Sequence, residues 1–192
     1  MITIIPTEEL EQNSPEWLNL RSKYISATDA WGLLNGKTIQ EILDSKSKSS
    51  NGFSGNYWTR RGHELEPEAK EVYSAVYQPT YNVGFVINDK YPLVGCSPDG
   101  LVNDDGMVEV KCFSLKRHYD VHKNLDPHII TQIQYQLWDT EREWNDLVLY
   151  NPSVENLKEA MFVHRFYPDK KIHKKFEDIF SKYLTDKGEH HG

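Results

Sequence analysis

The order of β-forming and helical segments between residues 80 and 168 constrains the fold more strongly than any other feature of this chain. Three short runs rich in β-formers come first, and the turn residues between them predict an antiparallel meander. A helix follows, with Asp126 as its cap and Pro127 at its first position, and two further strands come after it. This mixture predicts an α/β chain (mixed α+β) with a central mixed β-sheet flanked by helices. The predicted strands are 80–88, 91–96, 106–113, 144–152 and 160–168, and the helix is 126–141.

Helix signals also lie on both sides of this central region. Ser14 is placed as an N-cap, Ser26 and Asp29 have the spacing of a capping box, and Gly36 is placed as a helix stop. Pro67 interrupts a longer helical period and should kink that helix or mark a restart. The helices predicted in this way are 13–24, 25–36, 57–77 and 170–188.

The chain of 192 residues, 38% of them hydrophobic, can bury one sizeable core, and nothing in it demands a second domain. We therefore predict one domain over residues 1–192, with a flexible loop at 44–56 and a polar tail at 187–192. No apolar run approaches the roughly 20 residues that cross a bilayer, and the N-terminus lacks a signal-peptide pattern. These features predict a soluble, cytoplasmic protein with no membrane partner, in which Cys96 and Cys112 are free thiols.

The formal net charge of −7 argues against a protein that coats nucleic acid nonspecifically, because such binding depends on neutralising phosphates. The charge is unevenly distributed: basic residues gather in 111–123 and 164–175, and acidic residues gather in 63–71 and 139–146. Two interpretations stay open here. The pattern is compatible with a positive groove on an acidic body, and equally with ordinary solvated faces.

The stretch GCSPDGLVNDDGMVEVKC, residues 95–112, contains the candidate site. Residues two apart on a strand point to the same face, so Glu109 and Lys111 project together, and a hairpin would bring Asp99 alongside them. Two neighbouring carboxylates suit Mg²⁺, and an adjacent lysine can orient or deprotonate a water or stabilise charge on a phosphate. The alternative is a surface hairpin in which Asp99 is a turn residue and Glu109 simply pairs with Lys111.

The residues around this stretch resemble the PD-(D/E)xK nuclease signature, because Pro-Asp at 98–99 is followed by Glu-Val-Lys at 109–111. Longer blocks resemble those of the family of bacteriophage lambda exonuclease and the YqaJ-type viral recombinases. The blocks are WLNLRSKYISAT, RGHELEPEA, CSPDGL, EVKC and TQIQYQLW, and they run in the family's order from Trp17 to Trp138. The resemblance implies a restriction-endonuclease-like core for the predicted sheet.

The same resemblance implies roles for residues at the metal site. Asp99 and Glu109 would be the principal Mg²⁺ ligands, with the Val110 carbonyl contributing. Lys111 would position or activate the attacking water, and Glu66 on a helix would complete the metal site. The family places two metal ions there, and Mn²⁺ is expected to substitute for Mg²⁺.

The resemblance also implies a neighbouring glutamine and a pocket for a terminal phosphate. Gln132 matches the glutamine that the family places beside its active site. Arg21, Ser26, Thr28 and Ser97 match the family's pocket for a 5′ phosphate. An arginine fork with hydroxyls suits a dianionic terminus better than an internal diester, which makes the pocket physically reasonable.

The activity implied by the resemblance is a Mg²⁺-dependent 5′-to-3′ exonuclease that degrades one strand of duplex DNA from a 5′-phosphorylated end. The 3′ overhang would serve a single-strand annealing partner in phage-type recombination, in the cytoplasm of a bacterial host, and the enzyme would form a trimeric ring. Residues 36–56 and 113–126 differ from the family segments that contact DNA and neighbouring subunits. Two other functions remain open: a restriction-type or structure-specific endonuclease on the same core, and a catalytically inactive DNA-binding module.

Overall fold

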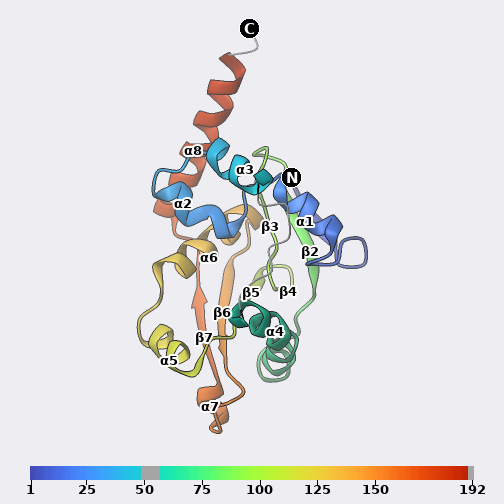
Figure 1. The fold of residues 1–192 in the computed structure, drawn as a ribbon, viewed down its shortest axis with the longest axis vertical. Helices are drawn as coiled ribbons and strands as arrows, with labels where there is room; N and C mark the ends of the chain where they lie inside the picture. Colours follow the sequence, from blue (N-terminus) through green and yellow to red (C-terminus); the bar gives the residue numbers. More distant parts are fainter. Residues whose placement is uncertain (49–56, 190–192) are drawn as a thin grey trace.

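The computed structural model describes residues 1–48 and 57–189 of the chain. The strands form two sheets, one of three strands in the order β1-β2-β3 and one of four in the order β4-β5-β6-β7 (Figure 1). The strands are β1 (Ile2–Pro6), β2 (Val83–Asn88), β3 (Gly95–Cys96), β4 (Gly100–Val102), β5 (Gly106–Lys111), β6 (Trp144–Tyr150) and β7 (Met161–Phe166).

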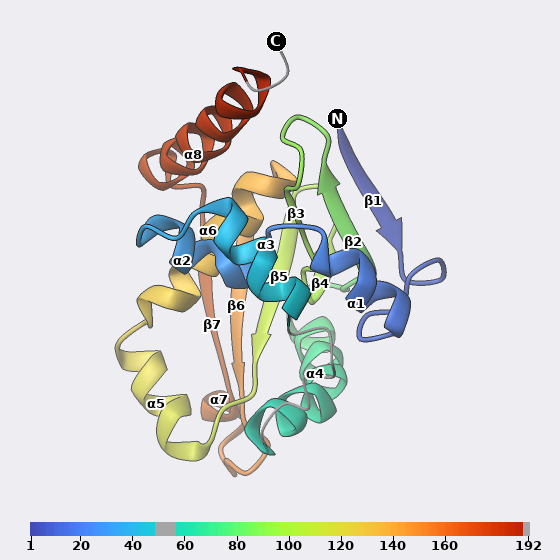
Figure 2. The ribbon, with the colours of Figure 1, turned by 45° about the horizontal axis from the view of Figure 1, so that its top comes forward.

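Helices surround these sheets, and the long C-terminal helix α8 extends away from the body toward the C-terminus (Figures 1 and 2). The helical elements are α1 (Pro15–Ser22), the short 3-10 helix η1 (Ala27–Asp29), α2 (Ala30–Leu34), α3 (Ile39–Lys48), α4 (Tyr57–Val76), α5 (Leu115–Lys123), α6 (Pro127–Thr140), α7 (Leu157–Ala160) and α8 (Lys170–Glu189).

The four-stranded sheet is mixed, as the order of elements predicts. Strand β5 pairs with β4 in the antiparallel direction and with β6 in the parallel direction, and β7 pairs antiparallel with β6. The parallel pair requires a crossover, and helices α5 and α6 provide it between β5 and β6. The mixed sheet flanked by helices is therefore confirmed.

The predicted antiparallel meander is right for its first two strands and wrong for its third. Strand β2 pairs in the antiparallel direction with β1 on one side and with β3 on the other, whereas β5 belongs to the other sheet. The chain leaves the first sheet after Cys96 and enters the second at Gly100, with Pro98 between them. Proline has no N–H to donate to a ladder, so it favours a break in pairing at this point.

The two faces of the four-stranded sheet pack against different helices. Val108 and Val110 of β5 cluster with Ala69 and Tyr73 of α4. Side chains alternate along a strand, so Glu109 points to the opposite face, which α6 covers. This alternation places a buried carboxylate of β5 against a helix rich in glutamine.

Local helix signals were read correctly where they depend on neighbouring residues. The Ser14 side chain accepts a hydrogen bond from the Trp17 amide at 3.1 Å, and Asp126 caps α6. Gly36 follows α2 with φ of 94°, a conformation in which glycine is favoured over other residues. Helix α4 is assigned as continuous through Pro67, so the proline does not restart it.

Several segment assignments differ from those expected. Helix α3 runs to Lys48, so the loop expected at 44–56 is wrong for its first part, and residues 49–56 lie outside the described residues. Helix α8 runs to Glu189, into the expected polar tail, whose last residues also lie outside that description. Strands β1 and β4 and the helices α3, α5 and α7 were not predicted.

The described residues can be compared with the predictions about the two cysteines and about membrane-spanning segments. Cys96 and Cys112 are both buried free thiols, as expected. Within residues 1–48 and 57–189, the helices lack the combination of length and apolar character that a bilayer-spanning segment needs.

Candidate active site

The hairpin of β4 and β5 brings together the three residues singled out from the sequence. Gly100 is the register partner of Val108, so Asp99, which precedes β4, lies beside the second half of β5. An Asp99 carboxylate oxygen accepts a hydrogen bond from the Val110 amide at 2.7 Å. The Lys111 ammonium donates to Glu109 Oε1 at 2.6 Å. The predicted convergence of Asp99, Glu109 and Lys111 is present.

Helix α6 holds the buried carboxylate of Glu109 through two glutamines. Glu109 is only 2% exposed, so its oxygens depend on protein donors. Gln132 donates to Oε1 and Gln136 donates to Oε2, each at 2.6 Å. Asn145 in turn donates to the Gln136 side-chain oxygen at 2.9 Å, which fixes the orientation of that amide.

Gln136 was missed by sequence reasoning. Gln132 and Gln136 are four residues apart, so they share one face of α6. That spacing was the available signal, but a glutamine on a helix says little until the facing residue is known. The structure shows that residue to be Glu109.

Helix α4 brings a third carboxylate and a second lysine to the site. Lys70 donates to Glu66 Oε1 at 3.0 Å, to the Asp99 backbone carbonyl at 2.9 Å and to Asn82 Oδ1 at 3.0 Å. Lys70 therefore ties the helix carboxylate to the segment that carries Asp99. Lys70 was not predicted as a site residue, although its position one turn after Glu66 is the usual spacing of a helical ion pair.

The electrostatics of the cluster are those of carboxylates crowded together. Burial raises the pKa of Asp99 well above its ordinary value, and the negative charges of Glu109 and Glu66 raise it further. Burial alone would lower the pKa of Lys111, but the charges of Glu109 and Asp99 outweigh it and raise that pKa. Lys111 is therefore a charged ammonium at neutral pH, which suits the orientation of a water or a phosphate better than proton abstraction.

The donor chemistry of this cluster fits a hard divalent cation. Three carboxylates influence one another electrostatically, and a bound cation would relieve the repulsion that raises the pKa of Asp99. In the part of the chain that the structure describes, no three acidic, histidine or cysteine side chains form a ready-made ligand group. The residues therefore fit such a metal by their type, while their ligand geometry is not preformed.

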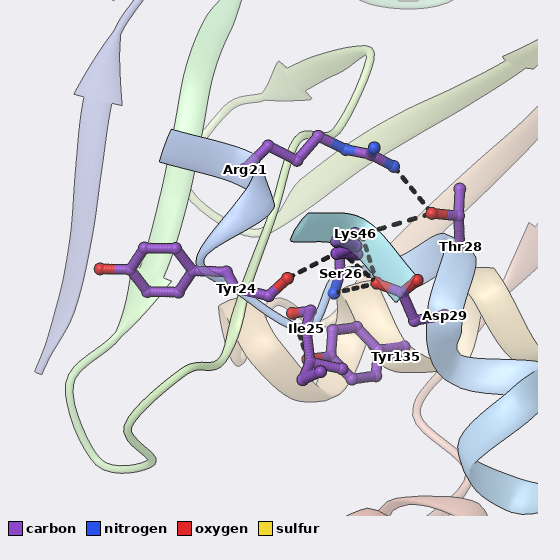
Figure 3. A network of polar contacts seen from close by, with 8 residues as sticks. All are labelled: Arg21, Tyr24, Ile25, Ser26, Thr28, Asp29, Lys46 and Tyr135. Atoms are coloured by element: carbon purple, nitrogen blue, oxygen red, sulfur yellow. Dashed lines mark hydrogen bonds and ion pairs between the residues drawn. The ribbon is translucent and has the colours of Figure 1, made fainter. Parts of the chain in front are cut away.

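A second polar cluster lies where α1, η1 and α3 meet (Figure 3). The Arg21 guanidinium donates to the Thr28 hydroxyl at 2.7 Å, and the hydroxyls of Thr28 and Ser26 are 3.3 Å apart. Burial lowers the pKa of Arg21, while the charge of Asp29 partly offsets this effect. Three of the four residues assigned to the phosphate pocket are thus brought together.

Ser97, the fourth residue, is joined to this cluster through Trp17. The Ser97 hydroxyl donates to the Gly84 carbonyl at 3.0 Å and accepts from the Trp17 indole at 3.0 Å. The Arg21 guanidinium carbon lies 5.2 Å from the centre of the Trp17 ring. Ser97 is therefore adjacent to the cluster without a direct hydrogen bond to Arg21.

Comparison with known sequences then places the chain in a family. The profile of the YqaJ-like viral recombinase domain matches residues 16–143, which include every candidate site residue discussed above. The chain belongs to the YqaJ-like viral recombinase domain family. A comparison with curated proteins finds no match.

Solved structures similar to this YqaJ-like chain support the fold. The alkaline exonuclease LHK-Exo from Laribacter hongkongensis is 26% identical, with a TM-score of 0.77, over 90% of this chain and 92% of that one. The same exonuclease in complex with dAMP matches with a TM-score of 0.78 at 26% identity over the same shares of the two chains. A phage-related exonuclease from Haemophilus somnus 129PT, 15% identical, covers 85% of this chain and 93% of that one with a TM-score of 0.55, which supports the fold alone.

Proposed function

We propose that this YqaJ-like chain is a Mg²⁺-dependent 5′-to-3′ exonuclease that degrades one strand of duplex DNA from a 5′-phosphorylated end. The alkaline exonuclease that it resembles supports a nuclease activity. One observation supports removal of nucleotides from a phosphorylated end. The carboxylate cluster (Asp99, Glu109 and Glu66) and the Arg21 cluster (Arg21, Ser26 and Thr28) are connected through the same structural elements. Ser97 and Asp99 are two residues apart on one segment.

Helix α6 provides a second link between the two clusters. Tyr135 donates a 2.8 Å hydrogen bond to the Ile25 carbonyl, just before Ser26 (Figure 3). Gln132 and Gln136, on either side of Tyr135 in the sequence, hold Glu109. A terminal phosphate held at Arg21 would therefore lie at a defined distance from the carboxylates, which is what removal of single terminal nucleotides requires.

The residues that would hold Mg²⁺ are Asp99, Glu109 and Glu66, together with the Val110 carbonyl. The bound ion would lower the pKa of a coordinated water and offset charge on the scissile phosphate. Lys111, kept charged by its neighbours, would orient the attacking water and stabilise the phosphate charge that develops.

Hydrolysis in this proposal proceeds without a covalent enzyme intermediate. The water oxygen bonds to phosphorus, the bond from phosphorus to the 3′ oxygen breaks, and that oxygen takes up a proton. Each cycle releases a nucleoside 5′-monophosphate and leaves a new 5′ phosphate on the shortened strand. The product would be a 3′ overhang for a single-strand annealing protein, and the family resemblance suggests a trimeric ring.

Digestion of matched DNA substrates tests this function. Linear duplexes with a 5′ phosphate should be shortened in Mg²⁺ faster than linear duplexes with a 5′ hydroxyl, and chelator should stop both reactions. Closed circular duplexes should remain intact. Cleavage of circles would favour an endonuclease, and binding of DNA ends without digestion would favour an inactive binding module.

Three alanine variants separate metal binding from chemistry. Asp99→Ala and Glu109→Ala should lose cleavage and weaken Mg²⁺ binding in calorimetry, because each removes an anionic ligand. Lys111→Ala should also lose cleavage but still bind Mg²⁺. Equal metal affinity in all three variants, or near-normal cleavage by Lys111→Ala, would contradict these assignments.

A further inference from the structure

Lys46 of α3, in a segment predicted to be a loop, extends into the polar cluster of Arg21, Ser26 and Thr28 (Figure 3). Its ammonium donates to the Tyr24 carbonyl at 2.7 Å and to the Ser26 hydroxyl at 3.2 Å, and it forms an ion pair with Asp29. The Lys46 side chain is only 14% exposed. Its long methylene chain is therefore buried with its charged end directed at the segment that contains Ser26.

Asp29 is the other support of this segment. One Asp29 carboxylate oxygen accepts hydrogen bonds from both the Ser26 amide and the Ser26 hydroxyl, each at 2.8 Å. The Ser26 proton is thus directed at Asp29, while a Ser26 lone pair receives Lys46. Ser26 is 3% exposed, so its hydroxyl supports the pocket from inside.

Arg21 and Thr28 occupy the accessible side of the same cluster. The Thr28 residue is exposed, and its hydroxyl oxygen accepts from Arg21 at 2.7 Å. Because the Ser26 proton is directed at Asp29, Thr28 is the donor in its 3.3 Å contact with Ser26, and a bound anion would compete with Ser26 for the Thr28 proton. Arg21 and Thr28 therefore have the geometry for direct contact, whereas Ser26, Asp29 and Lys46 lie behind them.

The charges of the cluster support an anionic ligand. Burial lowers the pKa of Lys46, the charge of Asp29 raises it, and the positive charge of Arg21 lowers it. The positive charge of Arg21 thus acts on Lys46, and both cations interact with the carboxylate of Asp29. A phosphate would offset the remaining positive charge.

We propose that Lys46 is a positioning residue for recognition of the 5′ phosphate: together with Asp29 it fixes Ser26 and Thr28 so that Thr28 and Arg21 are aimed at the terminal phosphate. This inference rests on the proposed exonuclease function. It assigns Lys46 no contact with the scissile bond.

The test compares Lys46→Met with Lys48→Met, which removes the same charge from an exposed position of α3. Rates are measured in Mg²⁺ on linear duplexes that carry either a 5′ phosphate or a 5′ hydroxyl. Lys46→Met should lower the ratio of the two rates by about ten-fold, the scale expected when a hydrogen bond to a charged group is lost. Its rate on 5′-hydroxyl DNA should stay near that of the wild type, as should both rates of Lys48→Met.

Binding provides a readout that is independent of turnover. In chelator, fluorescence anisotropy with the same two duplexes should show a smaller preference for the 5′ phosphate in Lys46→Met than in the wild type. Lys46→Arg, which keeps the charge and can still reach Asp29, should recover most of the preference. If Lys46→Met does not fold, Lys46→Arg still allows the phosphate preference to be compared with that of the wild type.

Asp29→Asn distinguishes positioning from simple charge. If Lys46 positions the pocket through Asp29, Asp29→Asn should also lower the phosphate preference, whereas a pocket governed only by net positive charge should show a higher preference. A higher preference in Asp29→Asn, or an unchanged one in Lys46→Met, would overturn the role of Lys46 while leaving the exonuclease proposal intact. A wild-type enzyme with no phosphate preference would overturn the pocket and this inference together.

Discussion

Asp139 on α6 is a fully buried carboxyl group whose ionisation should control stability in alkaline solution. Its side chain is 0% exposed, and neither oxygen has a hydrogen-bond partner among the described residues. Burial raises its pKa from 3.8 to about 8, and the nearby Cys96 thiol lowers it only in part. Asp139 is therefore protonated in the folded protein at neutral pH but ionised in the unfolded chain.

The sign of the effect follows from this difference in proton binding. The stabilisation from the proton on Asp139 is fully present below pH 3.8 and is lost as the pH rises through about 8. Between these limits the free energy of unfolding falls by about 1.4 kcal/mol per pH unit. From about pH 5 to about pH 8, the loss due to Asp139 should be roughly 3 to 4 kcal/mol.

Asp139→Asn removes this ionisation with little change in shape. Free energies of unfolding should be measured by chemical denaturation at several pH values for the wild type, Asp139→Asn and Asp186→Asn, an exposed control on α8. The free energy of unfolding of Asp139→Asn minus that of the wild type should increase by roughly 3 to 4 kcal/mol from about pH 5 to about pH 8. The difference between Asp186→Asn and the wild type should stay nearly constant.

A constant difference between wild type and Asp139→Asn over this pH range would refute the reasoning. It would mean that Asp139 has the same proton affinity in the folded and unfolded states. The unsatisfied buried carboxyl would then be relieved by a partner absent from the described contacts. A growing difference that also appeared in Asp186→Asn would instead assign the effect to general charge repulsion.

Three further substitutions test the residues that hold the candidate metal site. Gln136→Leu should lower the free energy of unfolding by about 1–3 kcal/mol in denaturation experiments, because it removes the donor to Glu109 Oε2. Gln132→Leu should lower that free energy by less, because Lys111 also donates to Glu109 Oε1. Equal losses of stability in the two variants would contradict these assignments. Lys70→Met should weaken Mg²⁺ binding in calorimetry by roughly ten-fold by releasing the helix carboxylate, and unchanged affinity would show that Lys70 serves the fold alone.

The sequence by itself determined features that depend on residues close together in the chain. The caps at Ser14 and Asp126 were readable because each side chain meets an amide two or three residues away. The common face of Glu109 and Lys111 follows from strand alternation. The approach of Asp99 was predictable because the hairpin that brings it to β5 closes over a short stretch.

Only the tertiary structure decided which distant elements face one another. Strand β1 and the two-residue strand β3 become strands through pairing with β2, and short local patterns do not specify a partner. Gln136, Lys70 and Lys46 are polar residues on helices and look like many solvent-facing side chains in sequence. Their roles arise because the fold places each beside a group that needs it: Glu109, the Asp99 carbonyl and Asp29, respectively. The free energy of a buried polar group depends on the group that it contacts in space, and for these three residues that group is distant in the chain.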